Sequence, residues 1–276
     1  MTSPITPPWR SEPTGPPDGW GPSATLTIMI LTYNEALHIE RCLAYAERVA
    51  DEIVVVDSYS TDGTPELAAR LGARVSQHAW TNYASQFNWA LANIEVRTKW
   101  VMRLDADEMV DEVLTDSLKR QLALASMEVG GFELNRRIRF LGQEIRHGSM
   151  SPMWVTRIWR NGHAHCESRW MDEHMVVDVG RVDRVQGSVV DDNLNSLTWW
   201  TDKHNRYASR EALDLLMHEH QEAQRAGRPP SRLNRQAQVK RWLKTEVYAR
   251  LPIATRAWMY YFYRMVLRGG ILDGSQ

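Results

Sequence analysis

The sequence predicts an α/β fold built around a mainly parallel sheet, and three features of residues 25–125 support that prediction. Short apolar runs of strand length recur, amphipathic segments of helical period separate them, and polar turns follow them. Apolar strands that alternate with amphipathic helices form right-handed β–α–β units with parallel neighbouring strands. A chain of 276 residues fits one large domain, or one domain with an appendage.

The predicted elements of this stretch follow one another regularly. Strands are expected at residues 26–31, 51–57, 73–78 and 98–105, and helices at 35–49, 62–72 and 81–94. The second helix has Pro65 in its first turn and Gly72 at its end, where these residues favour the beginning and the end of a helix. Residues 25 to about 125 therefore form the α/β part.

The pattern changes beyond this part. Residues 130–142 and 151–162 alternate apolar with polar or basic side chains, as half-solvated strands do. From Asn195 onward the sequence has helical character, with a polar linker at 221–232 and a division near Pro252. Residues 1–24 hold seven of the twelve prolines and are expected to be a disordered arm. We predict three regions, 1–24, 25–193 and 194–276.

The bulk composition excludes several classes of protein. Lys and Arg number 33 against 34 Asp and Glu, a net charge of -1, which argues against nucleic-acid binding. Cys42 and Cys166 form no metal-ligand spacing, and two distant cysteines suit a reducing cytoplasm. We expect no signal peptide and no transmembrane helix, because the N-terminus lacks the required pattern and no window approaches about 18 apolar residues.

Polar residues follow three of the predicted strands. Residues 32–35, 57–63 and 105–108 are rich in acids, hydroxyls and amides. Each set has a plain structural explanation: Asn34 or Glu35 can cap a helix, and Asp62 with Gly63 is common turn chemistry. Because ligands bind at the carboxyl ends of parallel strands, the three sets together favour a binding site.

Asp105 and Asp107 predict a metal at this site. Two carboxylates spaced in this way repel one another unless a cation lies between them, and hard oxygen ligands select Mg²⁺ or Mn²⁺. Such a metal commonly binds phosphate oxygens too. No phosphate-binding GxxxxGK[ST] or GxGxxG loop follows the first strand, so a nucleotide must be held by side chains such as Asp57 and Glu35.

The segments "TIMILTYNEALHIERCL", "EIVVVDSYSTDGT" and "WVMRLDADE" resemble the signature segments of inverting family-2 glycosyltransferases with the GT-A fold. "FLGQEIRHGS", "DEHMVVD", "KHNRYASREA" and "GGILDG" are similar to the bacterial branch that builds lipopolysaccharide core and exopolysaccharide. The resemblance runs from about residue 25 to the C-terminus. It implies a GT-A catalytic domain over 25–193 that moves one sugar from a nucleoside-diphosphate sugar, with UDP preferred, to a saccharide or lipid-linked acceptor.

The resemblance also implies roles for individual residues. The nucleotide-sugar pocket would comprise Thr32, Tyr33, Asn34, Glu35, Asp57, Ser60, Asp62, Gln86, Asn88, Arg103, Asp105 and Ala106. Asp105 and Asp107 would hold the Mn²⁺ or Mg²⁺ ion, which neutralises charge on the departing diphosphate. The general base would be Glu173, with Asp172 as the alternative. These two acids could instead satisfy a nearby arginine such as Arg169.

Weaker expectations concern the acceptor. Arg146, His147 and Trp170 are candidate phosphate or acceptor contacts, and a solvated turn is the alternative for the first two. The absence of a QxxRW tetrapeptide favours single addition over processive synthesis. The aromatic and arginine-rich residues 254–274 suit either an in-plane helix at the inner membrane face or packing on the catalytic domain.

Rival functions make different demands on the sequence. A sugar-nucleotide pyrophosphorylase needs a glycine-rich basic loop after the first strand, where "TYNEALHI" stands. A phosphatase with a nucleophilic Asp usually carries it on the first strand, whereas Asp105 closes the fourth. A non-catalytic sugar-binding scaffold of a polysaccharide assembly complex has no need of Asp105, Asp107 and Glu173 together.

Overall fold

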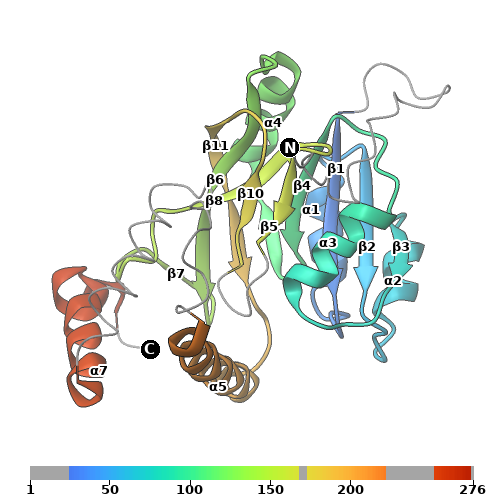
Figure 1. Cartoon of the computed structure of the whole chain (residues 1–276). Coiled ribbons are helices and arrows are strands. Elements are labelled where there is room, and N and C mark those ends of the chain that lie inside the picture. Colours follow the sequence, from blue (N-terminus) through green and yellow to red (C-terminus); the bar gives the residue numbers. More distant parts are fainter. Residues whose placement is uncertain (1–24, 168–172, 222–251, 275–276) are drawn as a thin grey trace, which may run out of the picture.

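The computed structural model describes residues 25–167, 173–221 and 252–274 (Figure 1). The predicted disordered arm at 1–24, most of the polar linker and the helical stretch before Pro252 lie outside the described residues.

Strands and helices alternate in the first half of the chain, and strands dominate the middle. The strands are β1 Leu26–Thr32, β2 Glu52–Asp57, β3 Arg74–Gln77, β4 Trp100–Asp105, β5 Glu108–Val110, β6 Val129–Phe140, β7 Gln143–Ile145, β8 Met153–Arg160, β9 Ala164–Cys166, β10 Met175–Val177 and β11 Arg181–Asp192. The helices are α1 Ile39–Ala46, α2 Thr64–Arg70, α3 Tyr83–Asn93, α4 Glu112–Leu124, α5 Leu197–Gln221 and α7 Ile253–Phe262, followed by the π-helical turn η4 Tyr263–Leu267 and the 3₁₀ turn η5 Gly270–Asp273.

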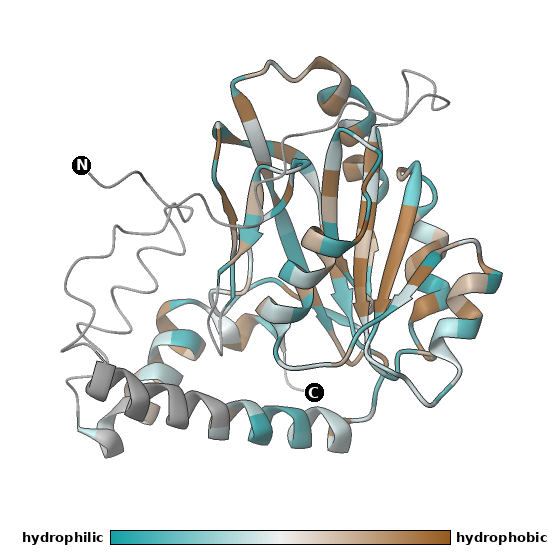
Figure 2. Ribbon diagram, turned by 45° about the vertical axis from the view of Figure 1, so that its right-hand side comes forward, coloured by the Kyte–Doolittle hydropathy of each residue, from teal (hydrophilic) through white to brown (hydrophobic). Residues whose placement is uncertain are grey.

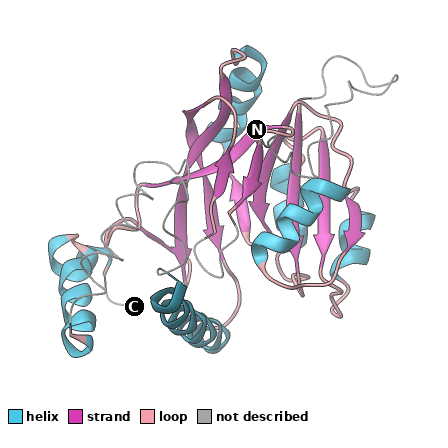
Figure 3. Ribbon diagram, in the orientation of Figure 1, coloured by secondary structure: helices cyan, strands magenta, loops and turns pink. Residues whose placement is uncertain are grey.

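One large sheet runs through the molecule in the order β3-β2-β1-β4-β8-β6-β11-β5, with β7 paired to β6 (Figure 3). The four strands β3, β2, β1 and β4 are parallel, as predicted. Beyond β4 the sheet is mixed, because β8 pairs antiparallel with both β4 and β6. Short connections such as the one between β6 and β7 permit antiparallel pairing, whereas parallel neighbours need a longer crossover. The half beyond β4 contains one further parallel pair, β6 with β11, between antiparallel neighbours.

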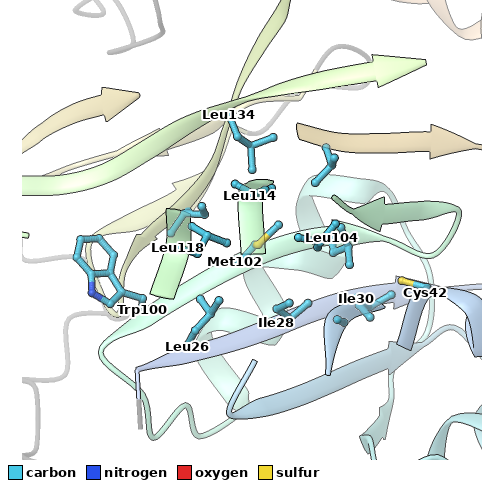
Figure 4. Packing of buried hydrophobic residues seen from close by; sticks show 14 of the residues in the cluster. Leu26, Ile28, Ile30, Cys42, Trp100, Met102, Leu104, Leu114, Leu118 and Leu134 are labelled. Atoms are coloured by element: carbon cyan, nitrogen blue, oxygen red, sulfur yellow. The ribbon is translucent and has the colours of Figure 1, made fainter. Parts of the chain in front are cut away.

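Apolar side chains on both faces of the sheet form the core. Leu26, Ile28 and Ile30 of β1 alternate onto one face, where they pack with residues of α1, α2 and α4 (Figure 4). Met29 points to the opposite face, toward α3 and the β9–β10 pair. Each fully buried aliphatic side chain contributes about 1.5–3 kcal/mol through removal from water. Two-sided burial explains why these strands are almost continuously apolar.

Local capping chemistry sets the helix ends near the site. Pro65 lies in the first turn of α2, and Gly72 follows that helix with a positive φ of 89°. The Asn82 side chain accepts a hydrogen bond from Ser85 N at the start of α3, and Asp111 accepts one from Leu114 N at the start of α4. Helix α4 lies within the residues that were predicted to form the α/β part, but no separate helix was predicted there.

Helix α5 runs along the lower edge of the sheet, toward which β1 and β2 point (Figures 1 and 2). Trp200 of α5 packs edge-to-face on Phe140 at the end of β6, with ring centroids 5.3 Å apart. This contact places the first turns of α5 beside the carboxyl ends of the strands. Within the described ranges, no helix combines the length and the apolar character needed to cross a bilayer.

Candidate active site

The carboxyl ends of β1, β2 and β4 lie side by side. The parallel registers pair Thr32 with Asp57 and Leu31 with Asp105. The polar residues that follow these strands therefore meet at one edge of the sheet. This edge is the position at which open α/β sheets bind ligands.

Asp57 is fully buried and organises the loop that follows β2. Its carboxylate accepts hydrogen bonds from Thr32 Oγ1 at 2.9 Å, Gln77 Nε2 at 3.1 Å, and both the backbone N–H, at 2.9 Å, and the hydroxyl of Ser60. A carboxylate offers about four acceptor positions, so these donors fill it. Asp57 thus fixes the loop at this edge of the sheet from beneath its surface.

The loop after β1 is tied to the loop after β2. Asn34 donates its N–H to Ser60 Oγ at 2.8 Å, and Glu35 N donates to Thr64 Oγ1 at 2.9 Å. Asp62 accepts from Ala36 N at 3.0 Å. Burial opposes ionisation of Asp62, but the hydrogen bonds from Thr64 and Ala36 outweigh it and lower the pKa of this carboxyl. The two loops form one hydrogen-bonded unit.

Two tyrosines stand out from this unit. Tyr33 is 60% exposed and Tyr59 is 56% exposed at the ends of neighbouring strands. Tyr59 also has a positive φ of 58°, which is uncommon for a bulky residue. Tyr33 belongs to the predicted pocket, and Tyr59 is an additional aromatic ring at the same edge.

The side chains of Gln86 and Asn88 in α3 form hydrogen bonds with other parts of the protein. Gln86 is fully buried, and its amide donates to Ser58 Oγ at 3.1 Å and to His78 O at 3.0 Å. Asn88 exchanges two 2.8 Å hydrogen bonds with the backbone of Cys166. These amides fasten α3 to the strand ends and to β9, so they support the edge from below.

Asp105 lies in a shell of donors. Its carboxylate accepts from Tyr83 OH at 3.0 Å and from Arg157 Nη2 at 3.0 Å. Arg103 contributes longer contacts of 3.3 and 3.4 Å. Burial opposes ionisation, yet Arg103 and Arg157 outweigh it and hold the pKa of Asp105 well below its usual range. Asp105 is therefore a fixed anion.

Glu108 and Asp191 continue the charge network inward. Glu108 is fully buried, accepts from Arg157 Nη2 at 2.8 Å, and lies 3.1 Å from Arg136 Nε. Burial raises its pKa to about 7, although the arginines oppose the shift. Arg136 also pairs with Asp191, whose pKa burial raises to about 6. Resident arginines thus supply much of the counter-charge that the acidic cluster requires.

Asp107 differs from its neighbours. Its Oδ2 accepts a 2.9 Å hydrogen bond from the amide of Asn193, and in the described part of the chain no basic side chain forms an ion pair with it. Its backbone carbonyl accepts from Asp192 N at 3.0 Å, which fixes the tip. The half-buried carboxylate keeps acceptor capacity for a hard cation. Over the described residues, no group of three or more metal-binding side chains is assembled. The donor chemistry of Asp107 therefore fits a metal that takes its other ligands from phosphate and water.

The predicted base Glu173 lies in the loop between β9 and β10, where it is half-buried. Burial raises the pKa of the neighbouring Cys166 thiol to about 12; Arg103 opposes this shift, while Glu173 and Asp105 add to it. The β9–β10 pair, whose connecting loop carries Glu173, packs with Val101 on one face of β4, and Asp105 lies four positions along the same strand and on the same face. The alternative base Asp172 and the candidate acceptor contact Trp170 lie outside the described residues.

A family model matches the part of the chain that forms this edge of the sheet. The model of "Glycosyl transferase family 2" matches residues 27–164, half of the chain, from the second residue of β1 through β8. The chain belongs to glycosyl transferase family 2. The predicted family and the predicted GT-A type of α/β fold with a helical C-terminal region are confirmed.

Several curated relatives of this family-2 chain are similar over part of their length. A lipopolysaccharide core biosynthesis glycosyltransferase, LpsC of Rhizobium meliloti, is 31% identical over 166 residues, which cover 58% of this chain and 60% of the relative. An uncharacterized glycosyltransferase of Rickettsia bellii is 37% identical over 94 residues, 34% of this chain and 31% of the relative. The chain thus matches from about a third to about 60% of the length of these two relatives.

Solved structures give more distant similarities. TarS of S. aureus in complex with UDP-GlcNAc is 17% identical with a TM-score of 0.45, and the match covers 62% of this chain and 59% of that one. Glucosyl-3-phosphoglycerate synthase of Mycobacterium tuberculosis, solved with Mn²⁺ and UDP, is 22% identical with a TM-score of 0.34 over 42% and 45% of the two chains.

Three residues of this family-2 site were missed by sequence reasoning. Arg157 and Tyr83 hold Asp105, and Asn193 holds Asp107. A partial signal exists for Arg157, which directly precedes the apolar pair Ile158 and Trp159 in the strand at 153–160. Nothing in the sequence pairs Tyr83 or Asn193 with an acid 22 or 86 positions away.

Proposed function

We propose that this chain is an inverting, metal-dependent glycosyltransferase. It would move one hexosyl unit from a nucleoside-diphosphate sugar, preferably a UDP-sugar, to a saccharide or lipid-linked acceptor of bacterial surface polysaccharide or lipopolysaccharide. The observation that carries the proposal is the edge at which β1, β2 and β4 end, where the tip acid Asp107 keeps free acceptor capacity. Family membership and the similarity to LpsC support the same activity.

Donor binding would use the two tied loops and the acidic tip. Tyr33 and Glu35 would face the nucleoside, above the buried carboxylate of Asp57. Asp107 would hold Mn²⁺ or Mg²⁺, with Asp105 beside it. A bound divalent ion supplies charge neutralisation on the diphosphate leaving group.

The transfer itself requires a general base. Glu173 would take the proton of the attacking acceptor hydroxyl while its oxygen bonds to the anomeric carbon and the bond to the diphosphate breaks. Attack from the face opposite the leaving group inverts the anomeric centre. The packing of the β9–β10 pair, whose loop carries Glu173, on the face of β4 that carries Val101 supports this role.

The test is UDP release from UDP-glucose with Mn²⁺. Asp107→Asn and Glu173→Gln are expected to lower the rate by about 100-fold or more, because each removes a group that acts in the transition state. Asp116→Asn, on the exposed face of α4, and Glu167→Gln, which follows β9 directly, are the matched controls. Unchanged release in both site variants would refute the assignment. Donor binding without any release, given a supplied acceptor, would favour the scaffold function instead.

The acceptor side suggests contact with the inner membrane face. Segment 252–272 contains no acid, and Trp258, Tyr261 and Phe262 are exposed. Exposed aromatic rings beside arginines suit the headgroup layer of an anionic bilayer. Flotation with anionic liposomes is expected to carry the protein upward, and Trp258→Ser with Phe262→Ser should abolish this. Absence of wild-type flotation would refute the contact without affecting the transfer activity.

A further inference from the structure

We propose that Arg157 is a positioning residue for donor binding: it fixes Asp105 at the strand end in the absence of any metal. This inference rests on the proposed function, because Asp105 belongs to the expected nucleotide-sugar pocket. It divides the acidic tip into two parts. Asp105 is held by resident arginine, and Asp107 is left for the cation.

The register of the sheet explains how Arg157 reaches Asp105. Strands β4 and β8 are antiparallel, with Val101 opposite Trp159 and Met102 opposite Ile158. The pairing ends there, and Arg157 is the next residue of β8, at a point where the register between β6 and β8 is irregular. Its guanidinium reaches the Asp105 carboxylate, which Arg103 also contacts from two positions back on β4.

The contact distances separate Arg157 from Arg103. Arg157 Nη2 donates to Asp105 Oδ2 at 3.0 Å, and its side chain is only 5% exposed. Arg103 lies further away, at 3.3 and 3.4 Å, and its guanidinium also covers the Tyr83 ring at 4.0 Å. A ligand hydroxyl can replace the long contacts of Arg103 more readily than the full hydrogen bond of Arg157. Arg157 is therefore the fixed member of the shell.

Glu108 binds both Arg157 and the backbone of Asp105. The same Arg157 nitrogen donates to Glu108 Oε1 at 2.8 Å, while Glu108 Oε2 accepts from Asp105 N at 3.0 Å. Arg157 and Glu108 thus hold both the side chain and the backbone of Asp105. With Arg157 removed, the fully buried Glu108 and the half-buried Asp105 would repel one another at the strand end.

The arrangement has a consequence for the donor. Asp105 keeps its orientation without a cation, so the nucleoside part of the donor has a prepared partner in the metal-free protein. The metal then acts mainly on the diphosphate, through Asp107. We expect UDP to bind weakly without metal and more tightly with Mn²⁺. The metal-free affinity should depend on Arg157, whereas the gain in affinity that Mn²⁺ adds should not.

The experiment compares Arg157→Met, Arg157→Lys and the double variant Arg157→Met with Glu108→Gln in the full chain. The double variant removes the buried charge together with its partner, so its melting temperature should return toward wild type. UDP affinity, measured by calorimetry in EDTA and in Mn²⁺, should remain about tenfold weaker in both media. Arg157→Lys should recover part of the affinity. Arg160→Lys is the control, because Arg160 lies on the same strand and donates to the carbonyls of Val129 and Ser126.

The outcomes are distinguishable. If the double variant melts as the wild type does and also binds UDP with wild-type affinity, Arg157 is purely structural and the inference is overturned. A loss of UDP affinity that follows melting temperature across all variants, and vanishes in the double variant, would overturn it as well. Wild-type protein that binds UDP in neither medium would overturn the proposed function itself, whatever the variants do.

Discussion

Asp273 accepts two hydrogen bonds from His147, one from the backbone N–H at 2.9 Å and one from the ring Nδ1 at 2.7 Å, although 126 positions separate the residues. Arg146 N donates to the same carboxylate at 3.1 Å, and the Gln143 amide donates to the Asp273 carbonyl. The turn η5 is therefore docked on the segment that follows β7. The candidate acceptor contact His147 owes its ring orientation to the C-terminal segment.

Replacing Asp273 by Asn should loosen this docking. Burial opposes ionisation of Asp273, but the His147 ring and two backbone N–H groups outweigh it and lower the pKa of the carboxyl. A lowered pKa stabilises the fold above the ordinary value of 3.8, and the contribution is lost as the pH falls through the folded value. Asp273→Asn should thus melt earlier than wild type at pH 7, and the gap should narrow as the pH falls below 3.8. Asp202→Asn on α5 is the control, and a gap that persists in acid would contradict the assignment.

Asp57 is expected to be a stability residue as well as a pocket residue. Asp57→Ala leaves four donors, of which Thr32 is buried, without their acceptor and should lower the free energy of unfolding by about 2–4 kcal/mol, measured by urea denaturation. Asp57→Asn should cost less, since one oxygen remains. Asp62→Asn, on the exposed loop, provides the comparison. Lost UDP binding with unchanged stability would mean that Asp57 contacts the nucleotide directly.

The two cysteines should be inert in the native protein. Both are free and buried. Burial raises the pKa of Cys42 well above its ordinary value, and it raises that of Cys166 to about 12. The thiolate is the reactive form, so neither should react with a thiol reagent near neutral pH until denaturant is added. Rapid native labelling confined to Cys166 would show that the β9–β10 pair opens, which a Cys166→Ser variant would verify.

Periodicity predicted the fold well because its signals are local. The strands and helices from β1 to β4 appear where apolar runs and helical faces predicted them, and Pro65 and Gly72 mark the two ends of α2. The strand order and pairing of the mixed half of the sheet, beyond β4, were not predicted. Its pairings join residues as distant as Met102 and Ile158, and alternation alone does not give a partner or a register.

The candidate site was predicted only in part, because some of its contacts are local in the sequence and others join distant strands. The carboxyl edge and its three polar loops follow from strand order, whereas the arginines that balance the acids come from distant strands. The spacing of Asp105 and Asp107 predicted that a metal ion would balance the charge of Asp105. In the structure Arg157 and Arg103 provide it, while the assignment of a metal to Asp107 stays a prediction.

Asn193 offers the sharpest test of that metal prediction. Its amide donates to one oxygen of Asp107 at 2.9 Å, and the adjacent Asp192 N donates to the Asp107 carbonyl. Asn193→Ala frees the carboxylate to rotate and should weaken Mn²⁺ binding, measured by calorimetry with UDP present, about threefold to tenfold. Asn193→Asp should do the opposite, since a second carboxylate repels Asp107 without metal and adds a ligand with it.

The Asn193→Asp variant should therefore melt earlier than wild type in EDTA and gain more from Mn²⁺ than wild type does. Asn195→Ala is the control, because Asn195 contacts Asn193 through its backbone N–H and keeps that hydrogen bond. Identical Mn²⁺ responses in wild type and in both Asn193 variants would place the cation away from Asp107. The acidic tip would then have a purely structural role, and the leaving group would have to be stabilised by side chains alone.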